Sequence, residues 1–245
     1  MSPAAGADWR FPAETAVLPS GDCGAAEAGK TLAPAATVAS MFLLVSGASG
    51  SGKSTARRHA AALLPESIEA VELRDLGEVP AVPTVAWRQQ QVEVAVRRAI
   101  ELVEQGRHLL FAGDPVPAGE VLAVPSADQV DVAVCLLDVD QDTQSARLDQ
   151  RGDPPEHRHL HHGFADWMRR HASDPAHLPE AVTTDAWPQM RWHRWTGRDP
   201  GPEWAMTVID TSPLTEAEVG AQVAAWCRDA ITGRAPVFRA GWWQP

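Results

Sequence analysis

The chain reads Phe42-Leu-Leu-Val-Ser-Gly47-Ala-Ser-Gly-Ser-Gly52-Lys53-Ser54-Thr55 where an apolar run of strand length breaks into a glycine-rich turn. A helix-compatible segment follows, from Thr55 to Leu64. The stretch matches the pattern G-x-x-x-x-G-K-[ST], in the strand–turn–helix context that the pattern requires. Glycines let backbone N–H groups converge on a polyphosphate, and a helix N-terminus adds the positive end of its dipole. The stretch therefore predicts a site for a nucleoside triphosphate.

Each residue of this phosphate-binding loop has an expected role. We expect Lys53 to reach the β- and γ-phosphates, and the Ser54 hydroxyl to bind Mg²⁺. The other residues predicted to contact the nucleotide are Gly47, Ser49, Gly50, Ser51, Gly52 and Thr55. The expected cofactors are Mg²⁺ and ATP or GTP. The alternative is a chance turn rich in Gly and Ser, which leaves the agreement of motif and context unexplained.

Composition restricts the possible partners. The chain has 245 residues, 44% of them hydrophobic, and a formal net charge of −11. Because nucleic-acid binding needs basic patches, this charge argues against a nucleic-acid partner. Three cysteines without a C-x-x-C pair suggest neither a disulfide framework nor a cysteine zinc site. Without an 18-residue apolar run or a signal-peptide pattern, no membrane partner is expected, and the expected location is the cytoplasm.

The chain divides into an extension and one domain. Residues 1–40 are rich in Ala, Gly, Pro and Ser without periodicity, which is typical of a disordered extension. Residues 41–245 alternate strand and helix, and whether translation starts at Met41 is left open. Strands are predicted at 41–46, 68–73, 108–112, 130–137 and 206–209, and helices at 55–64, 87–105, 141–151 and after the Thr215–Glu218 capping box. This alternation predicts an α/β fold, a five-stranded parallel sheet with helices on both faces.

Two further segments carry a family resemblance. The fourth strand, VAVCLLDVD, leads into a helix that ends Arg147-Leu-Asp-Gln-Arg151-Gly, and the last strand reads VIDTSPLTEAEV. With the phosphate loop at the start of the domain, these segments resemble the small P-loop kinases of the nucleoside-monophosphate-kinase-like group. That group includes adenylate and shikimate kinases, gluconokinase and the chloramphenicol phosphotransferase type. The resemblance covers about 41–152 and 205–231, and residues 153–204 match no pattern of the group.

Two aspartates are the candidates on the acceptor side. The resemblance implies that Asp75 faces the acceptor pocket, where a carboxylate takes or orients the hydroxyl proton, with Arg74 available for an anionic acceptor group. The alternative is a solvated loop pair. Asp114 follows an apolar strand beside the phosphate loop, a position that suits the outer shell of Mg²⁺. Asp114 has two alternatives, a role toward the acceptor and a plain turn aspartate.

Three more residues are candidates on the nucleotide side. In the kinase group the segment after strand four leads into a lid, which implies that Arg151 closes over the phosphates and Arg147 stacks on the nucleobase. The alternative is that both arginines pair with Asp142 or Asp149 on a surface helix. Asp210 begins a loop that either cradles the purine or only starts the last helix.

Residues 153–204 form the predicted lid-like insertion. We expect this polar, proline-broken segment to be irregular, to bury little apolar area and to open easily, with Arg158 moving toward the γ-phosphate on closure. Its histidines are interpreted as surface residues of the lid, with a zinc site as the alternative. Trp187, Trp192 and Trp195 either form a satellite core or present aromatic faces to a planar acceptor.

These observations predict an NTP-dependent kinase that transfers the γ-phosphate to a hydroxyl of a small molecule. A nucleoside monophosphate is a weaker candidate acceptor, because arginines are few between the second and third strands. The other alternative is a regulatory ATPase with no acceptor, and the N-K-x-D motif of a GTPase does not occur. The identity of the acceptor, the choice between ATP and GTP, and the oligomeric state are left open.

Overall fold

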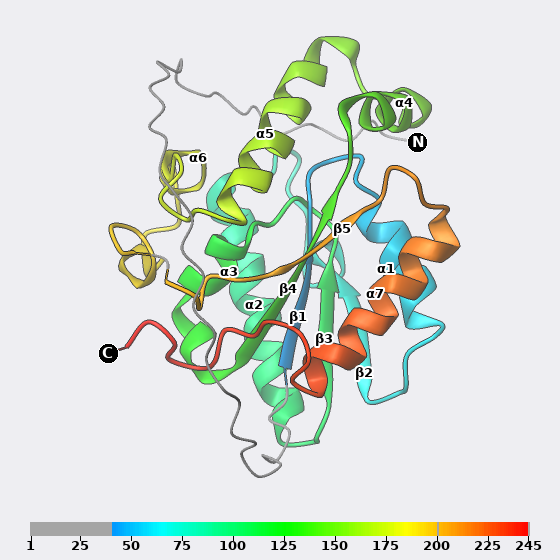
Figure 1. Ribbon diagram of the computed structural model, residues 1–245. Helices are drawn as coiled ribbons and strands as arrows, with labels where there is room; N and C mark the ends of the chain where they lie inside the picture. The colour runs from blue at the N-terminus through cyan, green and yellow to red at the C-terminus, as the bar shows by residue number, and fades with distance from the viewer. Residues whose placement is uncertain (1–40, 200, 245) are drawn as a thin grey trace, which may run out of the picture.

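A computed structural model describes residues 41–199 and 201–244, so the predicted disordered extension, 1–40, lies outside the described residues. Five strands form one parallel sheet (Figure 1). They are β1 (Met41–Ser46), β2 (Ile68–Glu72), β3 (His108–Ala112), β4 (Asp131–Asp138) and β5 (Thr207–Asp210). Their order across the sheet is β2-β3-β1-β4-β5. The predicted fold class is confirmed.

Strand β1 is the centre of the sheet. Leu43 pairs with Leu110 of β3 on one side and with Ala133 of β4 on the other. All six residues of β1 are buried, because helices cover both faces of the sheet and leave no solvated side. Since β3 and β4 lie on opposite sides of β1, the strand order changes direction at β1. Ligands of such sheets bind at this point, beyond the carboxyl ends of the strands.

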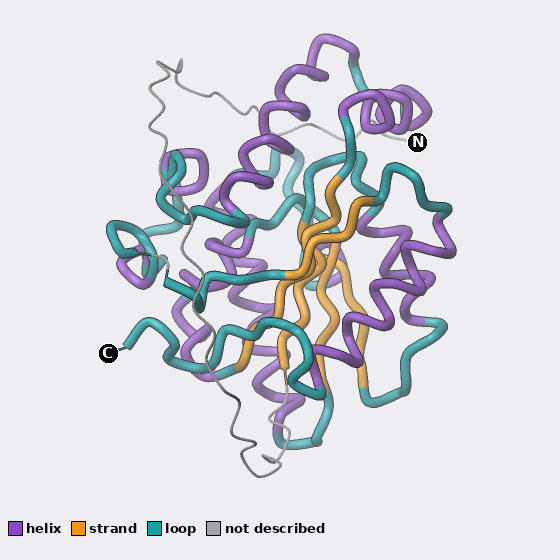
Figure 2. The backbone as a smooth tube through the Cα atoms, viewed as in Figure 1, coloured by secondary structure: helices purple, strands orange, loops and turns teal. Residues whose placement is uncertain are grey.

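Helices cover the two faces unequally. One face carries α1 (Lys53–Ala61) and α7 (Glu216–Ile231), and the other carries α2 (Val85–Val103), α3 (Ala118–Ala123) and α5 (Arg158–His171) (Figures 1 and 2). Helix α4 (Gln141–Arg151) lies beyond the end of β4, and α6 (Glu180–Thr183) is a single turn. Short 3₁₀ segments occur at Leu73–Asp75, Pro125–Gln129, Pro155–His157 and Trp192–Arg194. None of the helices in the described ranges has the length and apolar character of a membrane span.

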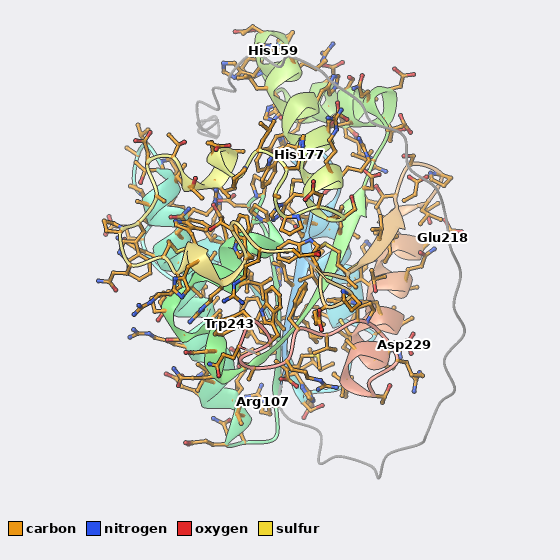
Figure 3. The ribbon with its side chains drawn as sticks, turned by 60° about the vertical axis from the view of Figure 1, so that its left-hand side comes forward. Arg107, His159, His177, Glu218, Asp229 and Trp243 are labelled. Carbon is orange, nitrogen blue, oxygen red and sulfur yellow. The ribbon has the colours of Figure 1, made fainter. Side chains whose placement is uncertain are left out.

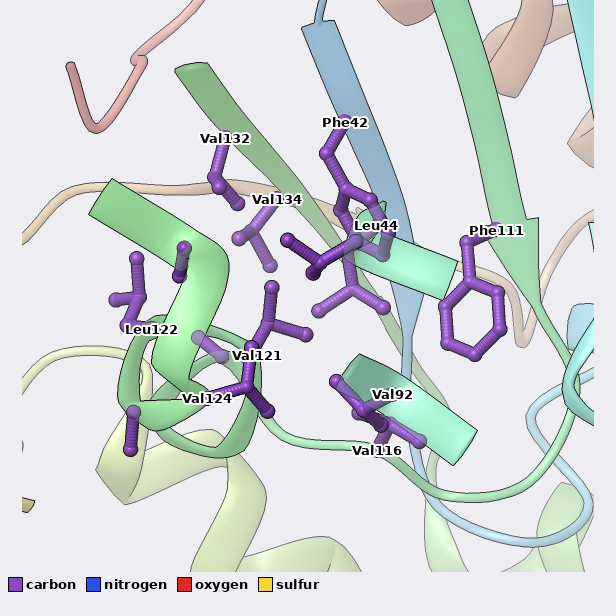
Figure 4. Close-up of a cluster of buried hydrophobic side chains, with 14 of the residues drawn as sticks. Phe42, Leu44, Val92, Phe111, Val116, Val121, Leu122, Val124, Val132 and Val134 are labelled. Atoms are coloured by element: carbon purple, nitrogen blue, oxygen red, sulfur yellow. The ribbon is translucent and has the colours of Figure 1, made fainter. Parts of the chain in front are cut away.

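The larger part of the core lies between the sheet and α2 and α3. Phe42 and Phe111 from neighbouring strands meet there with ring centroids 5.5 Å apart, and Val92 and Val121 approach from the two helices (Figure 4). Helix α3 was not predicted, because the prolines on either side of its six residues resemble loop punctuation. All of these six residues are buried.

Local signals fix both ends of α4 and the start of α7 as predicted. Helix α4 spans the predicted 141–151, since the Asp140 side chain accepts from Thr143 N and Gly152 ends the helix at φ 81°. In α7, Thr215 and Glu218 form the predicted capping box. The second helix differs, because Thr84 accepts from Trp87 N and starts α2 at Val85 rather than at Trp87.

The prediction of an irregular segment that buries little apolar area over 153–204 is wrong. The segment contains α5, α6 and two 3₁₀ turns. In α5, Phe164, Trp167, Met168 and His171 recur at helical spacing and are buried. Phe164, Trp167 and Met168 belong to the same buried cluster as Phe42 of β1, so the insertion packs on the main core.

The tryptophans of the insertion are structural, and they form no separate satellite core. Trp195 is 1% exposed and donates its indole N–H to Gly119 O at 2.9 Å. Trp204 donates to His171 O at 2.9 Å, and the His171 ring stacks on Trp167 with centroids 4.6 Å apart. Burial lowers the pKa of His171 to about 3, so its neutral ring accepts from Gly119 N. These hydrogen bonds and ring contacts therefore hold α5 against α3.

Candidate functional site

A cleft of about 1020 Å³ opens beyond the carboxyl ends of the strands. It is lined by the phosphate-binding loop and the start of α1, by residues that follow β2 and β3, by the start of α2, and by the junction of α4 and α5. The volume is at the upper end for ligand pockets, large enough for a nucleotide and a second small molecule. Arg107, just before β3, and His159 of α5 mark opposite ends of the molecule (Figure 3). The cleft opens at the end of the sheet that is nearer to His159.

The loop that follows β1 has the shape that a phosphate group needs. Gly50 and Gly52 adopt φ of 83° and 93°, which other residues rarely reach. At Gly47, φ is 146° and a Cβ would stand 2.7 Å from Leu137 O, so a side chain has no room. Helix α1 begins without a capping side chain, so its first N–H groups are available to an anion. The Ser51 hydroxyl is buried without a hydrogen-bond partner among the described residues.

Lys53 lies inside this loop. Its side chain is almost fully buried, and Nζ donates to Ala48 O at 2.8 Å. Burial lowers the pKa of Lys53 to about 7, and the negative charge of Asp114 opposes the shift only in part. The ammonium is therefore poorly solvated in the free protein, and a polyphosphate would supply the counter-charge that it lacks.

Arg147 reaches the loop from α4. Its guanidinium donates to Thr211 Oγ1 at 2.9 Å, to Thr211 O at 2.8 Å and to Gly50 O at 3.3 Å. The alternative of an ion pair with Asp142 or Asp149 is not what the structure shows. Arg147 lines the cleft with a positive charge held by neutral partners. Stacking of Arg147 on a nucleobase stays a prediction.

The junction of α4 and α5 forms the outer wall. Arg151 lines the cleft and donates from Nε to Asp153 Oδ2 at 2.9 Å, and His157 and His161 line it from the start of α5. Arg158 pairs with Asp149 and does not line the cleft. Its predicted movement toward the phosphates remains a prediction.

Gln144 of α4 joins this wall to the loop. Its amide nitrogen donates to Ser49 O at 2.7 Å and more weakly to His161 O at 3.4 Å. The side chain is fully buried. The phosphate-binding loop and the start of α5 are thus linked through one side chain.

Two carboxylates face the loop, and only one was predicted. Asp114 lines the cleft and accepts from Arg74 Nε at 3.2 Å. Glu72 lines it too and accepts from Arg57 Nε at 3.2 Å. Glu72 is the last residue of β2 and pairs in register with Ala112 of β3, two residues before Asp114. Glu72 was missed in the sequence analysis, although its position near the end of a predicted strand could have identified it as a residue of the cleft.

The predicted placement of Asp75 in the acceptor pocket is wrong. Its carboxylate accepts from Glu72 N at 2.9 Å and closes a 3₁₀ turn, and it does not line the cleft. Asp210 is likewise exposed and accepts from Ser212 N at 2.9 Å. The nucleotide end of the cleft is lined instead by Leu214 and Val219 at the start of α7.

The oxygen groups of the cleft fit Mg²⁺. Ser54, Asp114 and Glu72 all line it, and hydroxyl and carboxylate oxygens are the ligands that Mg²⁺ takes beside phosphate oxygens. Gly47 lies beneath the loop and outside the lining, whereas Ser49 through Thr55 all line it. Within 41–199 and 201–244, no group of three or more His, Cys, Asp or Glu side chains is arranged to hold a metal ion. The zinc alternative for the histidines finds no support there.

We expect nucleotide affinity to fall as the pH rises from about 7 toward 9, by up to about tenfold per pH unit, because the free protein loses the Lys53 charge above its pKa of about 7. Phosphate stabilises the ammonium and raises that pKa, so binding takes up a proton. Calorimetry of a non-hydrolysable ATP analogue in buffers of different ionisation enthalpy measures the uptake. The Lys53→Met variant is the control. If it takes up as many protons as the wild type, another group is responsible.

Sequence comparisons identify no family. No protein-family model matches the chain, and no curated protein aligns with it. The fold class is shown by the sheet and its helices rather than by sequence.

The solved structures to which this chain is similar are distant from it. A sugar kinase from Janibacter sp. HTCC2649 is 12% identical with a TM-score of 0.47, covering 78% of this chain and 98% of that chain. The tunicamycin resistance protein of Deinococcus radiodurans is 14% identical with a TM-score of 0.47, covering 77% and 95%. A shikimate kinase from Acinetobacter baumannii is 15% identical with a TM-score of 0.44, covering 79% and 95%.

Proposed function

We propose that this protein is an NTP-dependent phosphotransferase that places the γ-phosphate on a hydroxyl of a small molecule. One observation carries the proposal. A single cleft holds a phosphate-shaped loop with Lys53 and, facing it, the carboxylates Glu72 and Asp114. Phosphoryl transfer needs positioned cations for the phosphates and a group that orients the attacking oxygen, and this cleft offers both.

The roles follow from where each side chain lies. The N–H groups of the loop, Lys53 and Arg147 hold the triphosphate, and Lys53 meets the charge that develops on the γ-phosphoryl group. Ser54 would bind Mg²⁺, and Asp114, which is paired with Arg74, would support the ion from its outer shell; the ion would neutralise phosphate charge when bound. Glu72 takes the acceptor-side role predicted for Asp75. As the hydroxyl oxygen bonds to phosphorus and the bond to the leaving nucleoside diphosphate breaks, the hydroxyl proton passes to the Glu72 carboxylate.

The lid function belongs to a shorter segment than predicted. The stretch from Gly152 to His157 is mostly exposed and carries the cleft-lining Asp153 and His157, whereas α5 is anchored in the core from Phe164 onward. Closure of this short segment excludes water, which would otherwise take the phosphoryl group.

The test is phosphate transfer from ATP, and separately from GTP, to a panel of small alcohols with Mg²⁺. We expect one or more alcohols to gain a phosphate, seen by mass spectrometry, and release of the nucleoside diphosphate to rise when the alcohol is added. The Lys53→Met variant serves as the inactive control. Release of inorganic phosphate alone, at a rate that no alcohol changes, would instead identify a regulatory ATPase.

A further inference from the structure

Building on the proposed phosphotransfer, we infer that the acceptor is an uncharged hydroxyl compound that lays an apolar or aromatic face against Trp87. The inference rests on how the cations of the cleft are paired. In the nucleotide half, formed by the phosphate-binding loop and Arg147, Lys53 and Arg147 have neutral partners. In the acceptor half, formed by Arg74, Asp114 and the start of α2, the arginines have carboxylate partners, as Arg151 of the outer wall also has. The two halves are thus prepared for ligands of different charge.

In the nucleotide half the cations keep their charge available. Lys53 donates to the carbonyl of Ala48, and Arg147 donates to the carbonyl of Gly50 and to the carbonyl and hydroxyl of Thr211. None of these contacts neutralises a charge. A polyanion that enters here meets uncompensated positive charge, as a triphosphate requires.

In the acceptor half each lining arginine contacts a carboxylate. Arg74 pairs with Asp114 at 3.2 Å. Arg88 donates from Nε to Glu120 Oε2 at 2.9 Å and makes a second bond to the other oxygen of that carboxylate. The Arg88–Glu120 pair is nearly inaccessible, with side chains 6% and 0% exposed. The net charge of the acceptor half is therefore close to zero.

An acceptor with a carboxylate or phosphate would have to take one of these arginines. Taking Arg88 would leave the buried Glu120 carboxylate without its counter-charge, with only the neutral amide of Gln89 as a donor, and uncompensated buried charge is strongly unfavourable. Taking Arg74 would leave Asp114 beside the incoming anion. Glu72, whose partner Arg57 does not line the cleft, adds further repulsion. Binding of an anionic acceptor to either arginine of the acceptor half is therefore unfavourable.

Trp87 supplies the surface that an uncharged acceptor needs. It belongs to the first turn of α2, whose position is fixed by the Thr84 cap, and its half-buried ring packs on the core on one side. The ring lines the cleft together with Pro83, Val85 and Pro115. An aromatic ring offers a flat apolar wall, and the pairing of such a wall with apolar or aromatic faces favours binding beyond simple burial.

The inference is tested by ligand-observed NMR on the protein saturated with a non-hydrolysable ATP analogue and Mg²⁺. The probes are hydroxyl compounds in matched pairs, each a carboxylic acid and its primary amide. We expect the amides to bind about tenfold or more tightly than the acids. Trp87→Leu should weaken amide binding about tenfold while leaving affinity for the ATP analogue unchanged.

A variant that removes one charge gives the sharper test. Asp114→Asn removes the partner of Arg74, so the preference for amides should shrink about tenfold or reverse. The double variant Arg74→Met/Asp114→Asn is the matched control, because it removes the released cation and should restore the preference. Saturation with the ATP analogue is verified by calorimetry for each variant.

The outcomes separate this inference from the proposed function. Acids that bind the wild-type protein as well as their amides, or an absence of binding by any amide, overturn the inference. Neither result changes the conclusion on nucleotide binding, which calorimetry measures separately. A protein that binds no nucleotide overturns the proposed function itself.

Discussion

The Lys53→Ala variant is expected to lose phosphoryl transfer by a factor on the order of 10² to 10³. The ammonium lies in the loop at the N-terminus of α1, where it meets the charge that develops on the transferred group. The fold should survive. Because burial already disfavours the charged form of Lys53, its removal deletes a strained charge rather than a stabilising one. Steady-state kinetics and thermal unfolding measure the two effects.

Arg58→Ala is the matched control for this prediction. Arg58 lies on the same helix, is exposed and does not line the cleft, and its loss also removes one positive charge. Its transfer rate should equal that of the wild type. Transfer at the wild-type rate by the Lys53→Ala variant would contradict the assignment of the phosphate-binding loop, whereas an equal loss in both variants would indicate a general effect of charge.

The Trp195→Ala variant is expected to lower the free energy of unfolding by about 3–5 kcal/mol. Trp195 is 1% exposed, contacts the rings of His171 and Trp204 with centroids 5.2 and 5.9 Å away, and donates to Gly119 O. Its removal opens a cavity between the insertion and α3 and deletes the hydrogen bond to Gly119 O. Urea titration measures the change.

His193→Ala provides the comparison within the same 3₁₀ turn. His193 is exposed, so its replacement should change the free energy of unfolding by less than about 0.5 kcal/mol. A comparably small loss for Trp195→Ala would mean that the insertion opens at little cost, as its polar composition suggests, and that its contacts with the core contribute little to stability.

Features with local causes were predictable from the sequence. The phosphate-binding loop, β1 and α4 depend on neighbours in the chain, namely the glycines, the apolar run, and Asp140 and Gly152 at the helix ends. The capping box of α7 is a signal of the same kind. The alternation of these elements determines the parallel sheet, and so the edge at which the cleft lies.

The errors arose where the deciding contact is distant or ambiguous. Glu72 and Asp75 are three residues apart and both take part in the capping of the same 3₁₀ turn, and only the folded structure shows that Glu72 lines the cleft whereas Asp75 does not. The helical spacing of Phe164 and Trp167 was present in the sequence, but the surrounding histidines and arginines masked it. The contact of Gly119 with His171 spans 52 positions, and no local pattern announces it.

The placement of the tryptophans has an optical consequence. The chain has ten tryptophans and no tyrosine, so its intrinsic fluorescence comes from indoles. Among the tryptophans of the described ranges, Trp87 alone lines the cleft, while Trp167, Trp195 and Trp204 are enclosed in the core. A molecule that covers Trp87 is therefore expected to alter the emission of that indole, while Trp167, Trp195 and Trp204 stay enclosed. Occupancy of the acceptor half can thus be followed by light emission without any attached dye, and the Trp87→Leu variant supplies the blank.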